Sequence, residues 1–238
     1  MSSGALLRPV AKSRGKPRLD IRVNGIASIP SSVVDHETYR RWARSDDFPE
    51  QGRFAYLNGT IWIDLTMEQV FSHNAVKTAI ASALATFVRR QDLGYYFSDG
   101  NLVSHSGAGL SCEPDGCFLS YETVKSGQAR WVAGATEGFV EIEGAPDMTL
   151  EVVSTSSVAK DTQDLRELYW KAGIAEYWLV DARGPTLTFS LLKHAAKGYI
   201  EARRQADGWL RSPVFERSFR MTQRTDRLGN PQFELEVR

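Results

Sequence analysis

One stretch in the second half of the chain restricts the fold more than any other. An apolar run, MTLEVVS (148–154), precedes KDTQDLRELYWKAG, and a second apolar run covers Tyr177 to Val180. Between the two runs, apolar residues recur at helical spacing: Leu165, Leu168, Tyr169 and Ala172. Strand, helix and strand within about 35 residues form a βαβ unit, whose two strands are parallel neighbours in one sheet. The stretch therefore predicts an α/β fold.

The remaining elements extend this sheet. Asn58-Gly59 predicts a type I′ hairpin within RFAYLNGTIWIDL, and Val33 to Asp47 predicts a short helix. Thr66 and Gln69 match a capping box at the start of the clearest helix, TMEQVFSHNAVKTAIASALATFVRR. Further strands are expected at GYYFSD, NLVSH, GCFLS, FVEIEG, TLTFSLL, GYIEA, SPVF and QFELEV. We expect a single domain over residues 31–238, preceded by a flexible basic tail over residues 1–30.

Charge and composition exclude some classes of protein. The net charge of the 238 residues is zero, which argues against a protein that coats nucleic acid non-specifically. Residues 1–20 carry five cations against one acid, so this segment either contacts phosphates or is a solvated end. The chain has no apolar run near 18 residues and no signal-peptide core, so we expect no membrane span and a cytoplasmic location. Cys112 and Cys117 are expected to be packing thiols.

The strand MTLEVVS contains one costly residue, Glu151. Its neighbours Leu150, Val152 and Val153 are apolar, and an unpaired carboxylate among them would cost several kcal/mol to desolvate. A lysine or arginine could pair with it. Asp115, after Pro114 at the start of the predicted strand GCFLS, is by itself a common turn former. Together, two acids from adjacent strands could hold Mg²⁺, leaving metal-bound water free to attack a phosphodiester.

Several segments resemble the Uma2 family of restriction-endonuclease-like proteins, also called DUF820. They are PDGCFLS, APDMTLEVVSTSS, KDTQDLRELYWKAGIAEYWLVDARG and FSHN, and the resemblance covers roughly residues 35 to 200. It implies a restriction-endonuclease-like core, a mixed β-sheet flanked by helices, with an N-terminal hairpin and C-terminal antiparallel strands. It also implies a PD-(D/E)XK-type nuclease that uses Mg²⁺ or Mn²⁺ on DNA. A homodimer is expected by analogy alone.

Carried over by residue, the resemblance makes Asp115 and Glu151 the metal-binding acids. The family often has a lysine where this chain has Leu165, and the generic motif has one where this chain has Val153. Lys160 is the nearest lysine that could take the role of the missing one. It could equally be an exposed lysine in the first turn of the following helix. Arg166 and Lys171 are further candidates.

Two more positions come from the predicted capped helix. Glu68 is a possible third metal ligand, or an acid that stabilises the helix N-terminus through the helix dipole. His73 matches a histidine common in the family, which either positions phosphate or serves a structural role. If no lysine reaches the acids, the protein is a catalytically impaired member that binds nucleic acid or protein. A hydrolase of small phosphoesters would use the same acids.

Overall fold

The computed structural model describes residues 21–23, 27–135 and 137–238, and most of the predicted basic tail lies outside them. At its end, a two-stranded antiparallel hairpin that the sequence did not predict pairs β1 (Ile21–Val23) with β2 (Ala27–Ile29). Helix α1 (His36–Ala43) follows, and the Asp35 carboxylate caps it by accepting a hydrogen bond from Thr38 N at 2.9 Å. Tyr39 and Trp42 are buried on one side of α1, as predicted.

The central sheet carries the βαβ unit. Its strand order is β14-β13-β12-β11-β8-β5. β11 and β12 are parallel neighbours, as predicted, and every other pair in this sheet is antiparallel. The strands are β5 (Gly94–Ser98), β8 (Gly116–Ser120), β11 (Met148–Val152), β12 (Glu176–Asp181), β13 (Thr188–Ala195) and β14 (Gly198–Glu201).

A second six-stranded sheet has the order β4-β3-β7-β6-β10-β9. It begins with the predicted hairpin, in which Asn58 and Gly59 both have positive φ, as a type I′ turn requires. The β6–β10 pair is parallel and the others are antiparallel. Its strands are β3 (Arg53–Leu57), β4 (Thr60–Asp64), β6 (Leu102–His105), β7 (Leu110–Cys112), β9 (Ala129–Ala133) and β10 (Phe139–Gly144). Two short helices, η2 (Ser106–Ala108) and α3 (Tyr121–Lys125), connect strands.

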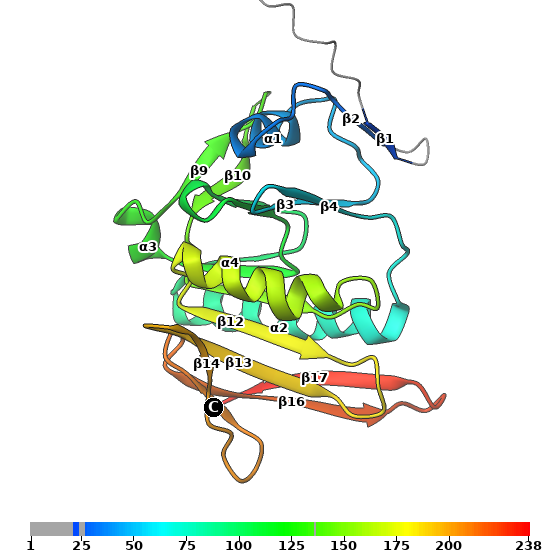
Figure 1. The fold of residues 1–238 in the computed structure, drawn as a ribbon. Coiled ribbons are helices and arrows are strands. Elements are labelled where there is room, and N and C mark those ends of the chain that lie inside the picture. Colours follow the sequence, from blue (N-terminus) through cyan, green and yellow to red (C-terminus); the bar gives the residue numbers. More distant parts are fainter. Residues whose placement is uncertain (1–20, 24–26, 136) are drawn as a thin grey trace, which may run out of the picture.

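Each face of the central sheet is covered (Figure 1). Helix α2 (Val76–Gln91) packs its buried stripe, Val76, Ile80, Leu84 and Val88, against Met148, Leu150 and Val152. The C-terminal antiparallel sheet joins this core: β15 (Leu210–Ser212), β16 (Arg217–Thr225) and β17 (Pro231–Val237). Helix α4 (Leu165–Ala172) packs on the opposite face with Tyr177 and residues of the second sheet. The predicted α/β fold, with mixed sheets flanked by helices, is confirmed.

Two local predictions are wrong. The capping box at Thr66 and Gln69 does not form, because the helical path starts as the π-helix η1 (Val70–Ala75) and Gln69 makes no side-chain cap bond. The segment SPVF is mostly a turn, and the strands lie on either side of it as β15 and β16. Cys112 and Cys117 are free and buried, as expected.

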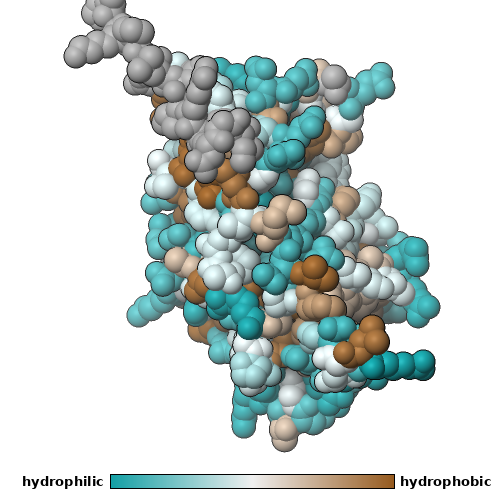
Figure 2. All heavy atoms as spheres, turned by 90° about the vertical axis from the view of Figure 1, so that its right-hand side faces the viewer, coloured by the Kyte–Doolittle hydropathy of each residue, from teal (hydrophilic) through white to brown (hydrophobic). Residues whose placement is uncertain are grey.

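The surface carries no single large apolar area on the face seen in Figure 2, where hydrophobic side chains form separate groups among hydrophilic ones. Within the part of the chain that the structure describes, the helices are too short or too polar to cross a lipid bilayer.

Candidate active site

The two predicted acids lie on neighbouring strands of the central sheet. β8 and β11 pair with Thr149 opposite Cys117 and Leu150 opposite Gly116. Continuing this register by one residue sets Glu151 opposite Asp115, which lies in the bend just before β8. Val152 N donates a hydrogen bond to Asp115 Oδ2 at 2.7 Å, which ties the aspartate to the end of β11. The structure thus places Asp115 and Glu151 at neighbouring backbone positions at the ends of adjacent strands.

Glu151 is nearly inaccessible to solvent, with 2% of its surface exposed. The Tyr169 hydroxyl donates to Glu151 Oε1 at 2.6 Å, and Lys160 Nζ lies 3.4 Å from Oε2. Burial raises the pKa of Glu151 to about 8, and the charges of Asp161 and Asp115 add to the rise while Lys160 and Tyr169 oppose it. The Glu151 carboxyl group therefore gains or loses its proton at about pH 8, close to neutral.

Lys160 reaches Glu151 because a serine turn reverses the chain after β11. Ser154 N donates to Ser157 Oγ at 2.9 Å and Ser157 N donates to Ser154 Oγ at 3.1 Å, so the serines form the turn. The π-helix η3 (Lys160–Asp164) follows, and Lys160 is buried at its start. Its Nζ lies 2.9 Å from Asp161 Oδ1 and 4.8 Å from the centre of the Trp62 ring. Burial lowers the pKa of Lys160, but Glu151 and Asp161 outweigh it and hold the pKa above its usual range. The ammonium is therefore charged.

Asp115 has a cationic neighbour, Lys77, and a histidine neighbour, His73. Lys77 Nζ of α2 lies 3.6 Å from Asp115 Oδ1, and His73 Nε2 lies 3.5 Å from Oδ2. His73 is buried with 3% of its surface exposed, so only a small part of the residue is open to the cleft that it lines. Its position beside Asp115 agrees both with a role in positioning phosphate and with a structural role.

Glu68 lies in the extended segment before the helix, which corrects its predicted place on the capped helix. It pairs with Arg53, with Lys77 Nζ at 2.5 Å and with Asn74 Nδ2 at 3.2 Å. Burial would raise the pKa of Glu68, but these hydrogen bonds and the charges of Lys77 and Arg53 lower it to about 2. Glu68 is therefore connected to Asp115 through Lys77.

Sequence reasoning missed several residues of the cluster of charged and polar side chains around Asp115 and Glu151. Lys77 carried a signal, because it lies four residues after His73 and therefore on the same helix face. Asp99 and Tyr169 had none, since their contacts depend on how distant segments pack. Asp161 lies next to Lys160 in the chain and contacts it locally. Arg166 instead donates to Tyr199 O at 3.3 Å, and Lys171 pairs with Glu167 at 2.5 Å.

The donor chemistry of Asp115 and Glu151 fits a hard divalent cation. Carboxylate oxygens are the ligands Mg²⁺ prefers, and Mg²⁺ usually keeps several waters beside one or two carboxylates. Among the described residues, no group of three or more His, Cys, Asp or Glu side chains has the geometry of a metal site. The case for a divalent cation at this site therefore depends on the carboxylates of Asp115 and Glu151.

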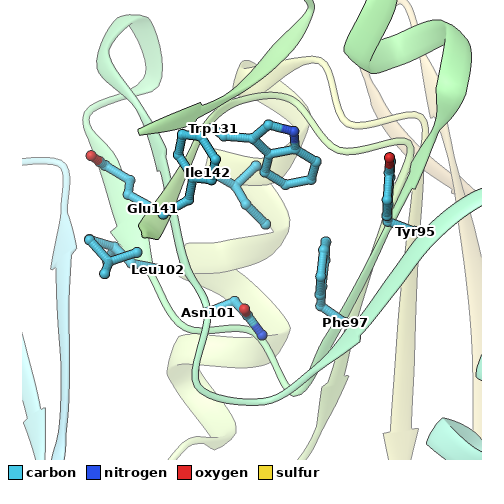
Figure 3. A pocket seen from close by; sticks show the side chains of 9 residues that line it. Tyr95, Phe97, Asn101, Leu102, Trp131, Glu141 and Ile142 are labelled. Atoms are coloured by element: carbon cyan, nitrogen blue, oxygen red, sulfur yellow. The ribbon is translucent and has the colours of Figure 1, made fainter. Parts of the chain in front are cut away.

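Two hollows of the surface have lining residues that neighbour the site in the fold, although neither is lined by Asp115 or Glu151. A cleft of about 240 Å³ is lined by Glu68, His73 and Arg53 together with the serine turn, and it gives solvent a path toward the cluster. A larger pocket of about 360 Å³ lies at the β5 edge, where Tyr95, Phe97 and Trp131 form an aromatic wall (Figure 3). Phe97 pairs with Cys117 of β8, and the side chains that line this pocket are mostly apolar. The polar chemistry is concentrated in the first cleft.

Comparison with known proteins agrees with this architecture. The model of a family described as "Uma2: Putative restriction endonuclease" matches residues 36–224. A solved structure from Anabaena variabilis ATCC 29413, described as "a putative nuclease belonging to DUF820", is 19% identical with a TM-score of 0.50. The match covers 68% of this chain and 83% of that chain, and at this identity it concerns the fold. No curated protein matched the chain.

Proposed function

The chain belongs to the Uma2 family of restriction-endonuclease-like proteins, and on this premise we propose that it is a metal-dependent endonuclease acting on DNA. In this proposal Asp115 and Glu151 hold Mg²⁺ or Mn²⁺, and Lys160 acts beside them. The observation that carries it is the register of β8 and β11, which sets the two acids opposite each other with Lys160 Nζ 3.4 Å from Glu151 Oε2.

The roles of the residues follow from their charges. A bound Mg²⁺ would supply an activated water and stabilise negative charge on the phosphate. Asp115 and Glu151 hold that ion, and Tyr169 fixes the Glu151 carboxyl through its hydroxyl. Lys160 is charged, so it orients the attacking water and attracts phosphate rather than accepting a proton. His73 positions phosphate near Asp115, and the role of Glu68 as a metal ligand requires it to leave Lys77.

A second candidate is a member of the family that binds nucleic acid without cutting it. One observation favours it: each acid already has a cation of its own, Lys77 for Asp115 and Lys160 for Glu151. Val153 also replaces the lysine of the generic motif. A single domain over residues 31–238, a homodimer and a cytoplasmic location stay predictions beside either candidate.

Cleavage of supercoiled plasmid DNA with Mg²⁺ or Mn²⁺ tests the proposal. The wild type is compared with Asp115→Asn, Glu151→Gln and Lys160→Met, which change charge with little change in volume. Glu122→Gln, on the exposed surface of α3, is the matched control. We expect nicking by the wild type and the control, and its loss in the three site variants.

The same protein samples separate the alternatives. Equal nicking by all variants would identify a contaminant and refute the proposal. DNA binding in a mobility-shift assay without any metal-dependent nicking would identify the non-catalytic member. Hydrolysis of a small aryl phosphodiester without action on plasmid would instead identify a small-phosphoester hydrolase.

A further inference from the structure

Lys77 is the most heavily engaged side chain in the cluster, and the proposed reaction gives it no role. Its ammonium lies 2.5 Å from Glu68 Oε1, 2.5 Å from Asp99 Oδ2 and 3.6 Å from Asp115 Oδ1. Three carboxylates thus surround one nitrogen atom.

The three acids come from separate parts of the chain. Glu68 precedes the helix, Asp99 follows β5 and Asp115 precedes β8. The β5–β8 register, with Ser98 opposite Gly116, sets Asp99 beside Asp115 when continued by one residue, and Asp99 N donates to Asp115 O at 3.2 Å. Asp115 therefore stands between Glu151 on one side and Asp99 on the other.

His73 supplies an independent sign that the cluster can take a further ligand. Its side chain is only 4% exposed, and Nδ1 has no hydrogen-bond partner among the described residues. The nearest carboxylate oxygen recorded for Nδ1 is Glu68 Oε1, at 3.6 Å, beyond hydrogen-bond length. The buried Nδ1 of His73 thus lies near Glu68 Oε1, the oxygen that Lys77 also contacts.

The charge of the cluster is not fully balanced by these side chains. Glu68, Asp99 and Asp115 contribute three negative charges, whereas Lys77 and Arg53 contribute two positive charges. Burial and the charge of Asp99 raise the pKa of Glu113 while Arg53 lowers it, so this acid contributes less negative charge than an exposed carboxylate would. Asp99 is half exposed, so an ion from solvent can approach from its side.

We propose that the Lys77 ammonium occupies the position of a second divalent cation, among Glu68, Asp99 and Asp115, and so limits the site to the ion held by Asp115 and Glu151. With Lys77 in place, these three carboxylates do not have the geometry of a metal site. Carboxylate oxygens suit a hard divalent cation as well as an ammonium, so removal of the ammonium would let them close around an ion. Sites that act on phosphodiesters often use two ions a few ångströms apart, and here a side chain takes one of those positions. The inference rests on the proposed function for the first ion.

Counting bound Mn²⁺ ions tests this without any measurement of activity. Lys77→Met removes the ammonium and keeps much of the side-chain volume. We expect isothermal titration calorimetry and the electron paramagnetic resonance of free Mn²⁺ to show one more bound ion per chain in this variant than in the wild type. Lys77→Arg keeps the charge and should bind as the wild type does. Lys171→Met, which removes an exposed lysine paired with Glu167, is the matched control.

The results distinguish this inference from the proposed function. An unchanged Mn²⁺ count in Lys77→Met, or a wild type that already binds two ions, would overturn the role of Lys77. A wild type that binds no ion refutes the first site, whereas a gained ion in Lys77→Met would still support the second. If Lys77→Met folds poorly, refolding should be restored by Mn²⁺ and not by NaCl of equal ionic strength. Failure of that rescue also counts against the inference.

Discussion

Glu151→Gln should change how the stability of the protein depends on pH. The amide keeps the oxygen that accepts the Tyr169 hydroxyl, but it cannot ionise. In the wild type, burial raises the pKa of Glu151 from its ordinary 4.5 to about 8. The folded protein therefore holds a proton on this group that the unfolded chain releases at lower pH.

The sign and size of the effect follow from this difference. Between pH 4.5 and about 8 the folded state binds more protons than the unfolded state, so the free energy of unfolding of the wild type falls as pH rises. The interval is about 3.5 pH units, and at about 1.4 kcal/mol per unit the total reaches about 5 kcal/mol as an upper bound. The free energy of unfolding of the variant does not fall in this way, so the variant should gain stability relative to the wild type as pH increases.

Urea unfolding at pH values from 5 to 9, with EDTA present, measures the difference. Any fixed cost of the amide is the same at every pH, so only the trend matters. Glu122→Gln should run parallel to the wild type, and saturating Mn²⁺ should flatten the wild-type curve because the ion favours the ionised carboxyl. A difference between wild type and Glu151→Gln that stays constant within about 0.5 kcal/mol across this range would refute the reasoning.

Three further results are expected. The affinity of the wild type for Mn²⁺, measured by calorimetry, should rise about tenfold per pH unit below pH 8, because the ion displaces the Glu151 proton, and an affinity independent of pH would contradict this. Glu176→Ala should lower the free energy of unfolding by about 3 kcal/mol in urea. It removes the acceptor of Trp178 Nε1, Ser212 Oγ and Val214 N, and Mn²⁺ binding should not change. Leu84→Ala, in the buried stripe of α2, should lower the free energy of unfolding by about 3 kcal/mol, because it leaves a cavity. A decrease below about 1 kcal/mol would show that neighbouring side chains fill the cavity.

Local patterns in the sequence determined much of the fold. The helical spacing between the runs at 148–154 and 177–180 specified the parallel pair β11–β12, and Asn58-Gly59 specified the β3–β4 hairpin. These succeed because the turn chemistry and the apolar period act within a few residues. β16 was missed because RSFRMTQRT is polar and lacks a clear alternation, so its pairing with β15 and β17 defines it. Tertiary packing likewise replaced the predicted capping box with the π-helix η1.

The sequence also singled out Asp115 and Glu151 as candidate metal ligands, through the cost of a carboxylate in an apolar strand and through the resemblance to a family, and that role stays a prediction. Tertiary structure alone decided what surrounds them. Lys77, Asp99 and Tyr169 are brought to the acids by strand register and by the packing of α2 and α4. Charge interactions act over a few ångströms in space, whereas a sequence records only separation along the chain. Lys160, nine residues after Glu151, could therefore be named from the sequence, but the other partners of the acids became known only when the sheet was assembled.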